Sequence, residues 1–379
     1  MVKLSSLSNL ISPPKHSWDD VFQTTYTGSF QKALTNNLFG FNHTMVPTAT
    51  QTNKEMHGLT FFVRPQLNLQ SDNIFNVRQF YNLLKGELGD PSGLLSLQAW
   101  LRQTLDPRLA LGYNSGVEMP GMGQSPLVDP KQAFIPILTN NLLSLSGWPD
   151  VNVGTFTSRP ALKNSEFSMV DGYYEIYNAF DIDTTFQNVV GNPIVGLMDT
   201  WIYYSCLVFE GRCVPYPDFI VENAIDYNTR IYRITLSKDK KQVAQIAASG
   251  ISFPFTVPKS NFFDFNRDIP YNDSNKEFSI RFKCNGAIYN DPILIYEFNK
   301  TVIQFNADMA DGKRGLLMTE ITTDLLNDDI AKKLLNNRGY PRINPDNMNL
   351  EWWIGKEIYK ARLSMYNSSL LSTLTSILP

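Results

Sequence analysis

The chain has 379 residues, of which 43% are hydrophobic, 12% aromatic and 18% charged, and its formal net charge is −3. A chain this long and this apolar can bury a large core, which excludes an intrinsically disordered protein. The small net charge excludes an overall attraction to nucleic acid or anionic membranes. Because charged residues are few, uncharged polar residues must cover much of the surface. Such a surface is typical of a protein that is covered by neighbouring proteins in an assembly.

Cysteine content and hydropathy bear on the compartment. Cys206, Cys213 and Cys284 form no Cys-x-x-Cys pair, which predicts buried free thiols in a reducing compartment and no zinc site. The first residues are too polar for a signal peptide, and no run reaches the roughly 18 apolar residues that cross a bilayer. We therefore expect a soluble protein, made in the cytoplasm, that does not insert into membranes.

The N-terminal part of the sequence predicts an arm and a mixed extension. Residues 1–58 are rich in Ser, Thr, Asn and Gln with scattered aromatics, which indicates an extended N-terminal arm that docks through aromatic anchors. Residues 59–165 are predicted to form a mixed α/β N-terminal extension. It opens with a strand-forming run that Arg64 and Pro65 end.

Two helices and a linker are expected within this extension. The spacing of apolar residues predicts helices over residues 74–86 and 93–105. Residues 112–131 contain four glycines and three prolines, a composition typical of a loop. A domain boundary is therefore expected near this loop.

The chain as a whole is predicted to have an α+β fold. Its periodic patterns are sharpest in residues 166–306, which we predict to form a β-barrel or sandwich with a packed helix. In residues 172–186, Tyr174 and Ile176 begin an alternation of apolar and acidic side chains, the period of a half-buried strand. Three further strands are expected over residues 226–237, over 243–255 with a break at Gly250, and over 277–286. The inward side chains of the last strand are Phe278, Ile280, Phe282 and Cys284.

A helix is predicted between the first two of these strands. Asn192 supplies a helix N-cap and Pro193 suits the first helical position, so the helix covers residues 193–209. Its buried stripe includes Trp201. We expect this helix to pack on the sheet and Trp201 to be buried.

Residues 307–379 are predicted to form a helical C-terminal extension. A turn over residues 308–315 and a short polar helix over 324–335 precede a breaker-rich loop over 339–346. A last helix is expected over residues 350–366. Its aromatic side chains, which include Trp352, Trp353 and Tyr359, either pack on their own domain or dock on a neighbour, and the apolar tail favours docking.

Residues able to support catalysis are few and scattered. The three histidines, His16, His43 and His57, all lie in the polar arm, where lone histidines are ordinarily surface residues. Asp181 and Asp183 share one strand face, so a carboxylate pair or a metal site is conceivable, although a solvated outer face explains them better. The sequence therefore predicts no enzyme, no cofactor and no metal.

The order of elements between residues 172 and 292 resembles the tail-tube fold of contractile bacteriophage tails. An alternating strand leads into a helix with Asp199 and Trp201, a later strand carries Gly250 and Pro254, and a strictly alternating strand closes the unit. The resemblance implies strands that join those of neighbouring copies in a sixfold ring. It also implies a central channel that DNA crosses without sequence-specific binding.

The extensions on both sides of this unit resemble those of a tube initiator or baseplate tube protein. Such a protein would be part of the virion and would contact the baseplate hub, other tail tube proteins or the sheath. A main tail tube protein and a tail-completion protein remain alternatives. Outside viruses, a single-copy adaptor and a carbohydrate-active β-protein that uses Asp181 and Asp183 are the rival hypotheses.

The residues expected to carry assembly or packing are aromatic or aliphatic members of these strands and helices. They are Tyr174, Ile176, Trp201, Phe278, Ile280, Phe282, Trp352, Trp353 and Tyr359.

Overall fold

The structure is a computed structural model that describes residues 57–87, 96–111, 125, 127–160, 166–172, 178–264, 267–268, 275–322, 339–361 and 364. Several predictions fall outside these residues: most of the arm, most of the linker, the helix over 324–335, and both Tyr174 and Ile176. His57 and Gly58, which the sequence assigned to the arm, belong to the first strand.

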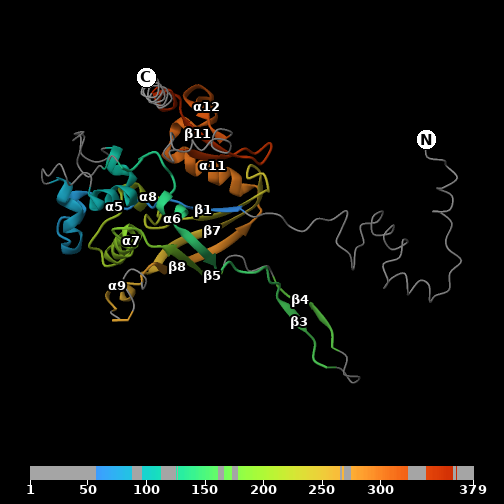
Figure 1. The fold of residues 1–379 in the computed structure, drawn as a ribbon. Helices are drawn as coiled ribbons and strands as arrows, with labels where there is room; N and C mark the ends of the chain where they lie inside the picture. Colours follow the sequence, from blue (N-terminus) through green and yellow to red (C-terminus); the bar gives the residue numbers. More distant parts are fainter. Residues whose placement is uncertain are drawn as a thin grey trace, which may run out of the picture. The chain divides into compact units, whose positions relative to one another are not determined.

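Among the described residues, six strands form an antiparallel sheet in the order β1-β6-β7-β8-β5-β2 (Figure 1). The strands are β1 (His57–Phe62), β2 (Leu142–Ser146), β5 (Ala179–Gln187), β6 (Ile231–Leu236), β7 (Val243–Thr256) and β8 (Glu277–Tyr289). A smaller sheet, in the order β10-β11-β9, contains β9 (Met318–Glu320), β10 (Tyr340–Ile343) and β11 (Leu350–Gly355). A separate hairpin pairs β3 (Thr155–Thr157) with β4 (Ser168–Val170).

The long helices of the described chain are α7 (Pro193–Phe209) and α11 (Ile293–Phe305). The shorter α-helices are α4 (Ser71–Ile74), α5 (Leu97–Leu105), α6 (Pro136–Asn140), α8 (Pro217–Val221), α9 (Ser260–Phe263) and α12 (Asp311–Leu317). The 3-10 helices are η2 (Arg78–Glu87), η4 (Pro107–Leu111) and η5 (Ala307–Met309). Together with the antiparallel sheets, these helices make the fold α+β, as predicted.

The two long helices cover opposite faces of the large sheet (Figure 1). On β6, Ile231 packs in the core cluster that includes Trp201 of α7, whereas the next residue, Tyr232, packs in the cluster that includes Phe298 of α11. Because neighbouring residues of a strand point to opposite faces, the sheet separates two cores. The strands β1 and β2 bring residues from the 59–165 segment into this sheet.

The predicted helix over 193–209 is confirmed as α7, which begins at Pro193. Trp201 is 1% exposed, and its Nε1 donates to the Tyr227 backbone oxygen at 2.8 Å. The predicted side-chain cap is wrong, because Asn192 has a φ of 49° and its side chain makes no cap hydrogen bond. Asn192 instead accepts from Asn188 through its side-chain oxygen, at 2.8 Å.

The predicted strands of the middle region are confirmed as β5, β6, β7 and β8. The predicted break at Gly250 is wrong, because β7 runs without interruption from Val243 to Thr256. Gly250 serves a different purpose: a Cβ there would lie 2.5 Å from the Asn285 backbone oxygen. Glycine is therefore required for the close approach of β7 to β8.

The helices predicted in the N-terminal extension are only partly correct. Instead of one helix over 74–86, α4 ends at Ile74 and a 3-10 helix follows from Arg78. The second helix is present as α5, which begins at Leu97 after Ser96, whose side chain accepts from the Ala99 backbone N–H. The 3-10 helix η2 is unusually long, because it spans ten residues whereas most 3-10 helices are only three or four residues long.

The predictions for the C-terminal extension fail at three places. The turn predicted over 308–315 contains α12, and the loop predicted over 339–346 contains β10. Residues 350–355, predicted as the start of a helix, form β11, which pairs antiparallel with β10 and β9. Trp and Ile favour strands when a neighbouring strand is available, and the partner β9 lies too far along the chain for local periodicity to reveal it. Residues 356–361 are helical.

Two further features differ from the sequence analysis. Helix α11 was not predicted, although its buried residues Leu294, Phe298 and Val302 recur every four positions. Of the three free thiols, Cys213 and Cys284 are buried as expected, whereas Cys206 is exposed. No helix among the described residues combines the length and the hydrophobicity that would let it span a membrane.

Candidate assembly surfaces

The outer face of β5 and β8 is polar and carries two cross-strand ion pairs. Asp181 lies opposite Lys283 and Asp183 opposite Arg281 in the strand register. Lys283 Nζ lies 2.7 Å from an oxygen of Asp181, and Arg281 Nε lies 2.8 Å from an oxygen of Asp183. Each carboxylate is thus compensated by its own cation across the strand.

This pairing bears on the hypothesis of a carboxylate or metal site at Asp181 and Asp183. The two carboxylates sit on one strand face, and each is engaged with a cation instead of facing the other across a cleft. Within the described ranges, no group of three or more His, Cys, Asp or Glu side chains is arranged to hold a metal ion. The geometry favours the solvated outer face.

The same face continues along β5 and β8 and onto β7. Thr185 and Ser279 lie opposite each other with their hydroxyl oxygens 3.2 Å apart. On the other side of β8, Ile251 and Phe253 of β7 lie opposite Asn285 and Lys283. We call this surface, formed by the outward side chains of β5, β8 and the C-terminal half of β7, the open face.

The β3–β4 hairpin exposes apolar side chains along both of its strands. Thr155 pairs with Val170 and Phe156 with Met169, and both apolar members of the second pair are more than half exposed. The remaining exposed apolar side chains of the hairpin and its stem are Val151, Val153, Phe167 and Val170. An isolated two-stranded hairpin is marginally stable in water, so this one suits contact with another surface.

The root of the hairpin is held firmly. The Trp148 ring contacts Phe180 and Tyr289, each with ring centroids 6.1 Å apart. The Tyr289 hydroxyl donates to the Pro149 backbone oxygen at 2.6 Å. Gly147, with a φ of 102°, lies where a Cβ would meet the Asp181 backbone oxygen at 2.1 Å. The hairpin therefore projects from a fixed base.

The two outer strands of the large sheet differ in how they are covered. The outer edge of β1 is closed at one end, where the Ile135 backbone N–H donates to the Phe62 oxygen at 2.9 Å and Val63 bridges to Phe134. Among the described residues, no strand pairs with the outer edge of β2, and Leu143 on β2 is half exposed. An open edge strand is a template for pairing with another chain.

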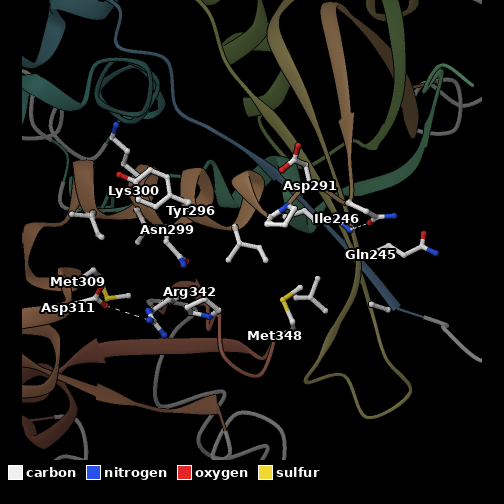
Figure 2. A pocket seen from close by; sticks show the side chains of 18 residues that line it. Gln245, Ile246, Asp291, Tyr296, Asn299, Lys300, Met309, Asp311, Arg342 and Met348 are labelled. Atoms are coloured by element: carbon white, nitrogen blue, oxygen red, sulfur yellow. Dashed lines mark hydrogen bonds and ion pairs between the residues drawn. The ribbon is translucent and has the colours of Figure 1, made fainter. Parts of the chain in front are cut away.

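A groove of about 770 Å³ lies between the start of β7, α11 and the segment around Arg342 (Figure 2). The Asn299 side chain both donates to and accepts from the Ile343 backbone, at 2.7 and 2.9 Å. Arg342 contacts Glu351 at 3.1 Å and Asp311 at 3.5 Å. The side chains of Asn299 and Arg342 thus bind within the chain, and aliphatic residues such as Val243, Ile295 and Val302 make part of the groove an apolar recess.

A buried polar cluster ties the N-terminal extension to α7 and α8. Asp106 accepts from the Leu69 backbone N–H at 2.9 Å and from the Tyr216 hydroxyl at 2.8 Å. Asp226 accepts from the Tyr204 hydroxyl at 2.5 Å. Burial raises the pKa of both carboxyl groups to about 6. Because the carboxyl groups are buried and bound to protein donors, the cluster is structural.

The predicted assembly and packing residues fall into two groups. Trp201, Phe278, Ile280 and Phe282 are buried together in the core beneath α7. Trp352 and Trp353 are half-buried on β11, and Tyr359 is half-buried in the helical segment after it. Arg314 lies over the Trp353 ring at 5.1 Å. In this chain these side chains pack internally, and their part in assembly stays a prediction.

One structural residue escaped the sequence analysis altogether. Arg64 is buried and donates to four backbone oxygens at 3.1 Å or less, which belong to Gln103, Thr104, Asp129 and Gln132. Burial lowers the pKa of this guanidinium to about 10. The sequence offered only the Arg64-Pro65 strand end, which carries no sign of these distant partners.

Comparison with known protein families gives one match over most of the chain. A family sequence model described as "Putative phage tail tube protein" matches residues 13–370. No curated protein sequence matches the chain.

Solved structures that match part of this chain include the following proteins. The tube terminating cap of the anti-feeding prophage is 16% identical, with 41% of this chain and 81% of that chain covered and a TM-score of 0.26. The sheath/tube terminator of an extracellular contractile injection system is 13% identical, with 42% and 87% covered and a TM-score of 0.23. A chain of the sheath–tube complex of such a system is also 13% identical, with 41% and 82% covered and a TM-score of 0.23.

Proposed function

Since the chain belongs to the phage tail tube protein family, we propose that it is a non-catalytic structural subunit of a bacteriophage tail. In this proposal six copies form a ring at the junction of the baseplate and the tail tube, where the ring initiates the tube and DNA passes through its centre. The partners are other tail tube proteins, the baseplate hub and the sheath. The observation that carries the ring is the open antiparallel sheet.

The ring closes through the outer strands of the sheet. The free edge of β2 pairs with the uncovered part of β1 in the next copy, so that the sheets continue into one barrel wall. The contact at Phe62 and the Thr60 oxygen, which accepts from the Thr139 hydroxyl at 2.7 Å, limit this pairing to the His57 end of β1. The fixed hairpin of β3 and β4 then reaches a neighbouring copy and buries its exposed apolar side chains there.

We base the position at the baseplate end on the elements that ring closure does not use. These are the helices of the mixed extension of 59–165, such as α4 and α5, and the C-terminal extension of 307–379. The C-terminal extension contributes its own sheet, which packs in the core beneath α11 through Ile343 and Leu350. Such additions suit a subunit that contacts unlike neighbours on its two sides.

The experiment is mass photometry and negative-stain electron microscopy of the purified chain, alone and with its neighbouring gene products. The matched variants are Leu143→Lys on the open edge of β2 and Val190→Lys at a site that is 99% exposed in a loop. Both variants add the same charge. A charge on an edge strand blocks pairing, so only Leu143→Lys is expected to abolish rings.

The outcomes separate the proposed function from its alternatives. Sixfold rings that Leu143→Lys removes and Val190→Lys leaves intact support the proposal, and a single ring per particle supports the initiator position. Long tubes of this chain alone would instead identify a main tube protein. A monomer under every condition would contradict the ring.

A further inference from the structure

The two ion pairs of the open face are too exposed to contribute much to the stability of the sheet. Both pairs join directly opposed residues, and their four side chains are between 41% and 59% exposed. Exposed pairs of this kind add little to stability because water and salt screen them. Yet both cations that β8 presents on this face, Arg281 and Lys283, have an acid directly across the strand.

Around Lys283, the surroundings of these pairs are poor in groups that hold an anion, whereas Arg281 lies opposite the hydroxyl-bearing Thr256. Lys283 lies between Asp181 on one side and the apolar Phe253 on the other. Asn285 lies next to Ile251 in the same way. Along this part of the open face, a polyanion would therefore meet cations already bound to acids, and apolar side chains beside them.

We propose that the open face is the surface turned toward DNA in the ring, and that Asp181 and Asp183 act as fixed counter-ions that keep Lys283 and Arg281 from binding phosphates. This inference rests on the proposed function. The partner of this surface is double-stranded DNA, of which only the dense negative charge of the phosphates matters here. Because its cations are paired, the surface lets the DNA move through the channel without binding it.

The physical reason lies in how proteins bind DNA without reading its sequence. Each Lys or Arg that neutralises a phosphate releases condensed counter-ions, and this release drives non-specific affinity. A ring presents every such cation in several copies, so even weak individual contacts would together bind the DNA tightly. A cation already paired with a carboxylate gains little from exchanging it for a phosphate.

The first test measures binding of the free subunit to a duplex of about 30 base pairs by fluorescence anisotropy over a salt series. The test variant is Asp181→Asn/Asp183→Asn, which unmasks both cations. The matched control is Asp239→Asn/Asp346→Asn, which removes two exposed acids and changes the net charge equally. The unmasked variant is expected to bind about 10-fold tighter at low salt, and its salt slope to steepen by about one to two.

Two results of this test would overturn the inference. Equal gains in both variants would mean that net charge alone matters, and no gain after unmasking would mean that the acids do not mask the cations. As a further check, Arg281→Gln/Lys283→Gln should leave the weak binding of the unchanged protein as it is. A marked loss would show that the cations already hold DNA.

The second test places the surface in the ring. Rings verified by microscopy are mixed with linear DNA, which can thread a channel, and with covalently closed circular DNA of equal length, which cannot. Unmasked rings are expected to retain the linear form selectively, whereas equal retention of both forms would put the open face outside the channel and contradict the inference. If no rings form, the proposed function fails together with the channel assignment, while the free-subunit test still decides the masking.

Discussion

The two faces of β8 differ sharply in burial and in polarity. One face carries Phe278, Ile280 and Phe282, which are buried against the core that α7 covers. The other carries Ser279, Arg281 and Lys283, which face outward and pair with β5. Because side chains alternate along a strand, one sequence can hold the fold with one face and leave the other face free for function. Changes to the two faces should therefore separate stability from assembly.

The largest effect is expected on the covered side. Trp201→Ala should lower the free energy of unfolding by about 3–5 kcal/mol, because it leaves a cavity and frees the Tyr227 carbonyl. Urea denaturation followed by circular dichroism measures this change. Phe209→Ala on the same helix, at a ring that is 93% exposed, is the control and should cost little. A loss below about 1 kcal/mol at Trp201 would contradict the packing of α7 on the sheet.

The next effect concerns pH and the buried cluster beneath α7. Burial raises the pKa of Asp226 from 3.8 to about 6, so its contribution to stability is present below pH 3.8 and is lost as the pH rises through 6. Asp226→Asn removes this loss. The variant should therefore gain stability relative to the unchanged protein between pH 4 and pH 7, by up to about 3 kcal/mol.

Thermal unfolding of both proteins across this pH range measures the gain. Asp218 provides a control of opposite sign, because its hydrogen bonds with Arg108 lower its pKa. Its contribution to stability is lost as the pH falls. A difference between Asp226→Asn and the unchanged protein that stays constant from pH 4 to pH 7 would argue against a raised pKa at Asp226.

A smaller effect on stability is expected at the ion pairs of the open face. Asp181→Asn/Asp183→Asn should lower the free energy of unfolding by less than about 1 kcal/mol, because all four side chains are partly exposed. Chemical denaturation at low and high salt measures it. A loss above about 2 kcal/mol would mean that these pairs hold the sheet together, and the contrast between the two faces of β8 would then collapse.

The smallest effect on folding, combined with a large effect on assembly, is expected in the hairpin. Phe156→Ser/Met169→Ser should change stability by less than about 0.5 kcal/mol, because both side chains are exposed in the single chain. The same variant should fail to form rings in negative stain. Rings that form as well as those of the unchanged protein would remove the hairpin from the assembly contacts.

The sequence predicted the middle of the fold well because the signals there are local. Strict alternation identified β8, and Asn192-Pro193 with the apolar stripe identified the start of α7 and the burial of Trp201. The family resemblance rested on the same elements, and the family match over residues 13–370 confirms it.

The parts that the sequence did not predict depend on partners far along the chain. β11 forms a strand between β10, whose paired residues are 7 to 13 positions away in sequence, and β9, whose paired residues are 33 to 37 positions away. The pairing of Asp181 with Lys283 depends on the register of β5 and β8, which periodicity alone cannot supply. The backbone oxygens that accept hydrogen bonds from Arg64 likewise belong to residues about 40 to 70 positions away in sequence.

The central claim, that the chain closes into rings through the outer strands of its sheet, is tested most directly by a cryo-EM reconstruction of the assembled protein. The account predicts a sixfold ring in which β2 of each copy is hydrogen-bonded to β1 of the next and the open face lines the channel. A ring whose copies meet through other surfaces, with both outer strands left unpaired, would contradict it.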